Sequence, residues 1–104
     1  MTQAVILTMV ADREQGLKIA RSLVEAGLAA CVNVIGGATS VYRWQGKVCE
    51  ERELLLVIKT EAANFTEIKE RILSLHDYEL PEIVMFHIDK GLSLIHISEP
   101  TRHL

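Results

Sequence analysis

The sequence has little cysteine, no run of basic residues and no long apolar stretch. Its two cysteines, Cys31 and Cys49, are too few for a disulfide framework and are not spaced as a CxxC pair, which favours free thiols in a reducing compartment. Because the net charge is −3 and the basic residues are scattered, neither nucleic acid nor an anionic membrane surface is expected as a partner. No apolar stretch approaches the ~20 residues that a membrane-spanning helix needs.

The start of the chain, MTQAVILTMVADRE, also lacks a basic segment followed by a small-residue cleavage site, so it does not have the pattern of a secretion signal. Together these absences predict a cytoplasmic protein. What is present is 49% hydrophobic and 24% charged residues, a composition typical of a globular chain. A length of 104 residues is enough for one domain with a core of its own.

Hydrophobic periodicity and turn residues predict two helices and four strands. Asp12 followed by Gln15 is typical of a helix start, and Gly27 is typical of a helix end. Gln45-Gly46 predicts a hairpin turn, and Gly36-Gly37 in the first arm predicts a bulge or bend. In chain order we expect a strand at 5–10, a helix from 12 to about 27, hairpin arms at 30–44 and 47–60, a helix from about 61 to 76 and a strand at 83–88.

This order, β-α-β-β-α-β, predicts an α+β fold of the ferredoxin-like type, with both helices on one face of the sheet. Yet residues 54–58 and 83–86 are apolar on both faces, and no further segment is left to cover the open face. At ~3.3 Å per residue, a hairpin arm of about a dozen residues reaches ~40 Å, longer than a domain of this size is wide. The hairpin must therefore project, and the two features together predict an obligate oligomer.

Three segments carry a resemblance to a known family. ACVNVIGGATSVYRWQGKV, ELLLVIKT and LHDYELPEIV, in this order and spacing, resemble the CutA family of divalent-cation tolerance proteins, over about residues 5–88. The resemblance implies a ferredoxin-like protomer assembled as a trimer, related in architecture to the PII signalling proteins. It also implies a cytoplasmic setting in bacteria and a link to copper and other divalent cations, without an established enzymatic reaction. One departure is Gly36-Gly37, where family members often carry Pro-Gly.

The segment HDYELPEI is the first candidate site. His76, Glu79 and Glu82 offer one imidazole and two carboxylates, a set suited to Cu²⁺ and also to Zn²⁺, while Tyr78 lies among them and is expected to line the same cleft. The alternative is structural: His76 interacts with the end of the preceding helix, and the two glutamates pair with arginines.

Four more residues are candidates for the metal site or for the cleft between subunits. Cys31, at the start of a strand, offers a thiolate that would favour Cu(I), or else it is a small buried apolar residue. Tyr42 and Trp44 alternate on one face of the projecting arm and are expected to anchor it on a neighbouring subunit. Lys59 either meets a carboxylate of the HDYELPEI segment or is a solvated strand end.

Two functions follow from these residues and the resemblance. The first is a trimeric protein that binds a divalent cation, copper before zinc, and acts in metal tolerance without catalysis. The second is a PII-like sensor that binds a small anionic metabolite in the cleft between subunits. An enzyme is not expected, because the sequence contains no nucleophile–base pair and no glycine-rich phosphate loop.

The end of the chain differs from the rest. LSLIHISEPTR resembles the translation of a transposon-type sequencing adapter, so residues 92–104 are expected to be a non-native tail, and residues 1–91 the domain. His96 and His103 are accordingly not counted among the candidate ligands.

Overall fold

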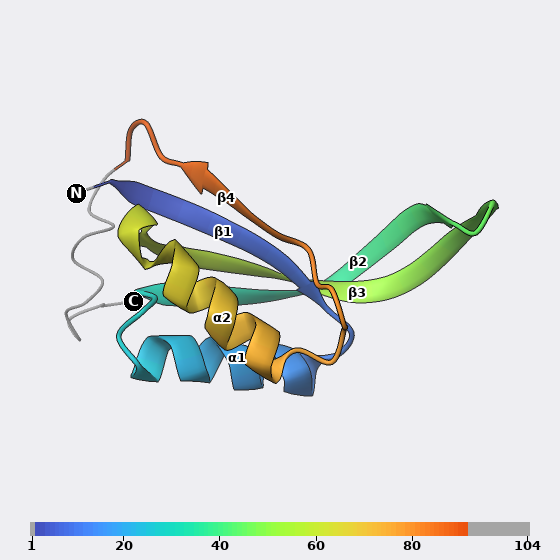
Figure 1. The fold of residues 1–104 in the computed structure, drawn as a ribbon, viewed down its shortest axis with the longest axis horizontal. Helices are drawn as coiled ribbons and strands as arrows, with labels where there is room; N and C mark the ends of the chain where they lie inside the picture. The colour runs from blue at the N-terminus through green and yellow to red at the C-terminus, as the bar shows by residue number, and fades with distance from the viewer. Residues whose placement is uncertain (1, 92–104) are drawn as a thin grey trace.

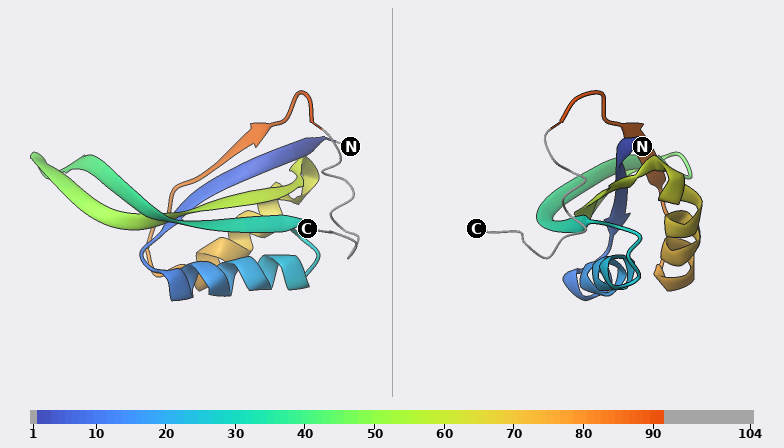
Figure 2. Two further views of the ribbon diagram at one scale, coloured as in Figure 1. Left: turned by 180° about the vertical axis from the view of Figure 1, so that it is seen from behind. Right: turned by 90° about the vertical axis from the view of Figure 1, so that its left-hand side faces the viewer.

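A computed structural model describes residues 2–91 of the chain. The strands are β1 (Gln3–Val10), β2 (Cys31–Trp44), β3 (Lys47–Glu61) and β4 (Ile83–His87); the helices are α1 (Arg13–Glu25), the short 3₁₀ helix η1 (Ala62–Asn64) and α2 (Phe65–Leu75). The strand order is β2-β3-β1-β4 with every neighbouring pair antiparallel, and both helices lie on one side of the sheet (Figures 1 and 2). The predicted order of elements is confirmed. The expectations for residues 92–104 lie outside the described residues.

Helix α1 begins and ends as its sequence predicts. The Asp12 carboxylate accepts a hydrogen bond from the backbone N–H of Gln15 (2.8 Å), which satisfies one of the free donors of the first turn. At the other end, Gly27 has a φ of 73°, a left-handed conformation that favours glycine. The N–H groups of Gly27 and Leu28 bond to the carbonyls of Val24 and Leu23, the paired closure typical of a helix that ends at glycine.

Helix α2 begins later than expected, because the preceding strand is longer. Glu61 was expected in the helix, but it belongs to β3, where it pairs with Gln3 of β1. The chain then turns through η1 before the first residue of α2, Phe65. The expected helix start was therefore wrong by about one turn, since the β1–β3 ladder competes successfully for Glu61.

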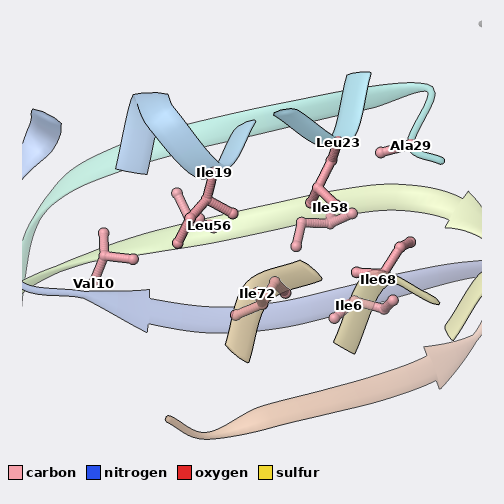
Figure 3. Packing of buried hydrophobic residues seen from close by; sticks show 9 residues of the cluster. All are labelled: Ile6, Val10, Ile19, Leu23, Ala29, Leu56, Ile58, Ile68 and Ile72. Carbon is pink, nitrogen blue, oxygen red and sulfur yellow. The ribbon is translucent and has the colours of Figure 1, made fainter. Parts of the chain in front are cut away.

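The core lies between the two helices and one face of the sheet (Figure 3). Along β1, alternate residues are buried: Ile6, Thr8 and Val10 face the helices and are buried, whereas Leu7 and Met9 are half-buried. The buried cluster consists of Ile6, Val10, Ile19, Leu23, Ala29, Leu56, Ile58, Ile68 and Ile72. All the large side chains of this core are aliphatic, so the core depends on close packing of branched residues.

The opposite face of the sheet is mostly apolar and carries no helix among the described residues. The register of the ladders places one set of mostly apolar side chains on it, together called the open face below: Val5, Leu7, Met9, Asn33, Ile35, Leu55, Val57, Val84 and Phe86. Phe86 is 57% exposed and Ile35 47% exposed. An uncovered apolar sheet face agrees with the sequence expectation; trimer formation remains a prediction.

The β2–β3 hairpin extends well beyond the helices, so the molecule measures 46 × 28 × 26 Å (Figures 1 and 2). Its turn is Gln45-Gly46, as predicted. Both residues have positive φ, 50° and 79°, as the two-residue turns that match the twist of antiparallel strands require.

The bulge in β2 is also confirmed, and it decides which face the arm presents. Ile35 pairs with Leu55 and Ala38 pairs with Glu53, so β2 contains one extra residue at Gly36-Gly37. Because side chains alternate along a strand, one extra residue exchanges the two faces. Tyr42 therefore lies on the same side of the sheet as Ile35.

Candidate functional site

His76 follows α2 and is held by two backbone groups. Its Nδ1 lies 3.0 Å from the backbone nitrogen of Tyr78 and accepts that N–H, and its Nε2 lies 2.6 Å from the carbonyl oxygen of Met9. Since Nδ1 accepts, the ring proton is on Nε2, which donates to Met9. The imidazole thus ties the loop to β1, and it can ligate a metal only by giving up one of these bonds.

Tyr78 connects the same loop to β3. Its ring packs on His76 with the centroids 4.6 Å apart, and its hydroxyl donates to the Glu53 carboxylate (2.7 Å). Burial raises the pKa of the Tyr78 phenol above its ordinary value, and the hydrogen bond to Glu53 raises it further. The phenol is therefore a fixed donor over the normal pH range.

A second phenol–carboxylate pair lies beside the first. Tyr42 of β2 donates its hydroxyl to Glu51 of β3, and this hydrogen bond raises the pKa of Tyr42 to about 12. Glu51 and Glu53 are two residues apart on β3, so both carboxylates lie on one face of the strand. Tyr42, Glu51, Glu53 and Tyr78 form the phenol–carboxylate cluster, which runs along the hairpin arm.

The tyrosines provide a direct test of this cluster. A pKa raised in the folded state favours the protonated phenol, so the Tyr42–Glu51 bond is complete below the ordinary value of 10.0 and is lost as the pH rises through about 12. The chain has two tyrosines, so Tyr78→Phe leaves Tyr42 as the only phenol. We expect its near-ultraviolet absorbance titration to have a midpoint of about 12. Adding Glu51→Gln should return the midpoint towards 10.0; a midpoint of 10.0 in Tyr78→Phe alone would contradict the pairing.

The structure does not bring the four predicted metal ligands together in one chain. Glu79 and Glu82 are exposed in the loop, near His76 in sequence. Cys31 lies opposite Lys59 of β3. His76 bonds to Met9, and Met9 lies opposite Leu55 of β3. Because Lys59 and Leu55 are four residues apart, Cys31 and His76 are separated by ~13 Å along the strand. Within residues 2–91, no three His, Cys, Asp or Glu side chains form a group that could hold a metal ion.

Lys59 is likewise distant from the HDYELPEI loop of its own chain. Lys59 pairs with Val5 of β1, while the loop reaches β1 at Thr8, whose hydroxyl donates to the Glu82 carbonyl (2.7 Å). Beyond Lys59, Gln3 and Glu61 face each other across β1 and β3. The Nε2 atom of Gln3 and the Oε2 atom of Glu61 are buried, and neither has a hydrogen-bond partner in the described part of the chain.

The open face is thus mostly apolar in its middle, where Asn33 is polar, and polar at both ends. The phenol–carboxylate cluster lies at the hairpin end, and Cys31 and Lys59 lie at the far end. The sequence analysis missed Glu51 and Glu53. Their alternation in CEERE is a weak signal, because it identifies partners only when the register across the bulge is known.

The split βαβ topology, with two helices on one face and a projecting hairpin, defines a ferredoxin-like α+β protomer. Residues 4–94 match the CutA1 divalent ion tolerance protein family, and the chain belongs to this family. The resemblance noted from the sequence is confirmed. The family is a non-catalytic one, so the expectation of a protein without enzymatic activity is confirmed as well.

Relatives from distant organisms share the sequence and the fold. The chain is 49% identical to the divalent-cation tolerance protein CutA of Thermus thermophilus over 86% of each chain, and the solved structure of that protein superposes with a TM-score of 0.83. It is 41% identical to the chloroplastic CutA protein of Arabidopsis thaliana over 84% of this chain and 48% of that protein. The structure of the periplasmic divalent cation tolerance protein CutA of Archaeoglobus fulgidus superposes with a TM-score of 0.84 at 31% identity, covering 88% of each chain.

The names of these relatives place them in different compartments, one chloroplastic and one periplasmic. Neither helix in the described part of this chain is long and apolar enough to cross a membrane.

Proposed function

We propose that this chain is a cytoplasmic homotrimer that binds a divalent cation, Cu²⁺ before Zn²⁺, and acts in metal tolerance. The observation that supports it most is the open face of the sheet, mostly apolar in the middle and polar at both ends, on a chain whose relatives are named for divalent-cation tolerance. Packing of three such faces would remove the apolar side chains from water and turn the polar ends into clefts between subunits.

The projecting hairpin supports the trimer independently. Its tip exposes Val41, Trp44 and Val48, each more than 60% accessible, far from the core of its own chain. Large apolar side chains at the end of an arm are typical anchors for a neighbouring subunit.

We assign the metal to the HDYELPEI loop, with the ligand set completed across the subunit contact. Glu79 and Glu82 are exposed carboxylates, and His76 would offer Nε2 after releasing the Met9 carbonyl. Imidazole nitrogen and carboxylate oxygen suit Cu²⁺ and Zn²⁺. Because Cys31 lies at the opposite end of the sheet from this loop in its own chain, it would reach the metal only from a neighbouring subunit.

Calorimetric titration with Cu²⁺, Zn²⁺ and a panel of nucleotides tests this function. We expect metal binding without nucleotide binding. His76→Ala, and separately the double variant Glu79→Gln/Glu82→Gln, should weaken Cu²⁺ binding by about tenfold or more, since ~1.4 kcal/mol corresponds to a decade in affinity. Both variants should remain trimeric.

The matched control is Glu67→Gln/Glu70→Gln, which removes the same two charges from exposed positions on α2 and should leave the affinity unchanged. Unchanged Cu²⁺ affinity in the loop variants would contradict the assignment of the site. Nucleotide binding in the absence of metal binding would favour the PII-like sensor instead.

A further inference from the structure

A groove of about 580 Å³ lies on the helix side of the molecule, away from the open face of the sheet. Most of its lining comes from one face of α1, and α2 contributes Arg71. The groove uses none of the residues assigned to the metal or to the subunit contacts. A trimer packed through the open face would leave it accessible.

Arg71 distinguishes this groove from an ordinary exposed helix surface, because its side chain is held in place by the other helix. It is half-buried, and its Nη1 donates to the hydroxyl of Ser22 on the other helix (2.8 Å). This bond uses one of the five N–H donors of the guanidinium and fixes the direction of the side chain. Arg71 lines the groove, and its remaining N–H donors are not used by this bond.

Two further cationic side chains belong to the same groove. Lys18 and Arg21 both line the groove, and on α1 they lie four and one residues before Ser22, so both come from the stretch of helix next to the Ser22–Arg71 bond. The carboxylates of the groove are at its ends: Glu14 and Glu25 are eleven residues apart, or ~16 Å along the helix. The groove is therefore positive in its middle and negative at both ends.

We propose that this groove binds a small multivalent anion whose charge is carried by phosphate or carboxylate groups. An oriented arginine fork matches either group with two parallel hydrogen bonds, and Lys18 and Arg21 add charge at the same place. Glu14 and Glu25 restrict the ligand to a short one, because a continuous polyanion such as nucleic acid would meet a carboxylate at each end.

The test uses the full chain without added metal, titrated at low ionic strength with inorganic pyrophosphate and, separately, with citrate. Calorimetry gives the affinity, and the amide resonance of Ser22 in a ¹⁵N spectrum gives the location. We expect submillimolar binding of at least one probe, weakened about tenfold or more by Arg71→Gln and several-fold by Ser22→Ala. Ser22→Ala leaves the charge of the groove unchanged and removes only the bond that orients Arg71.

Lys69→Gln is the matched control, because it removes one positive charge from an exposed position on the same helix outside the groove. It should change the affinity less than about twofold. Binding of pyrophosphate alone would identify a phosphate ligand, and binding of citrate alone a carboxylate ligand. The proposal is overturned if the Ser22 amide does not shift with millimolar concentrations of either probe, or if Lys69→Gln weakens binding as much as Arg71→Gln does.

Discussion

Replacing Val57 with glutamate is expected to abolish the trimer. Val57 lies in the middle of the open face, between Asn33 of β2 and Leu7 of β1, and points away from the helices, so the core of the protomer does not contact the new carboxylate. In a trimer packed through this face, three unpaired carboxylates would be buried, at several kcal/mol each. Light scattering should give about three times the 11.6 kDa chain mass for the unmodified chain and a much smaller mass for Val57→Glu.

The chain offers a closely matched control for this experiment. Val24→Glu makes the same replacement on α1, where the valine is 44% exposed on the helix side of the molecule. We expect this variant to remain trimeric, with circular dichroism showing the same helix content as the unmodified chain. A trimer that tolerates Val57→Glu would show that the open face is not the contact, and a monomeric unmodified chain would end the proposal of an intersubunit metal site.

Features set by neighbouring residues could be predicted from the sequence. The Asp12 cap, the Gly27 helix end and the Gln45-Gly46 turn each depend on a backbone conformation or a hydrogen bond within a few residues. The start of α2 was misplaced because the ladder pairs Glu61 with Gln3, which lies 58 residues earlier in the chain.

The candidate site was less predictable for the same physical reason. The acceptor for His76 Nε2 is the carbonyl of Met9, 67 residues away in the chain, and the acceptor for Tyr78 is Glu53, 25 residues away. No local pattern indicates these partners. The sequence therefore showed that the loop is rich in polar side chains, but not that its imidazole is engaged by β1 or that its phenol reaches the hairpin.

The bulge at Gly36-Gly37 is a local feature with a long-range effect. With its extra residue in β2, Tyr42 and Trp44 lie on the same side of the sheet as Ile35. Removing one residue from β2 at this point would restore strict alternation along the strand. Ile35 and Tyr42 would then be six residues apart and Ala38 would still pair with Glu53, so Tyr42 and Trp44 would stay on the open side of the sheet. The hydrogen bond between Tyr42 and Glu51 could still form, but the bend that the bulge gives to the arm would be lost, and the tip would meet a neighbouring subunit at a different angle.

Deletion of Gly37 is therefore expected to weaken or abolish the trimer, whereas the Tyr42 phenol should keep its midpoint of about 12 and the core between the helices and the sheet should stay folded. Light scattering measures the first effect, and the absorbance titration in a Tyr78→Phe background measures the second. The control is Gly36→Ala. An added Cβ at Gly36 meets no atom within 4 Å, and its φ is not positive, so trimer mass and titration should both be unchanged. A Gly37-deleted chain that is as fully trimeric as the unmodified chain would show that the bend does not position the arm, and a Tyr42 midpoint of 10.0 would show that the pairing of the arm does not survive the deletion.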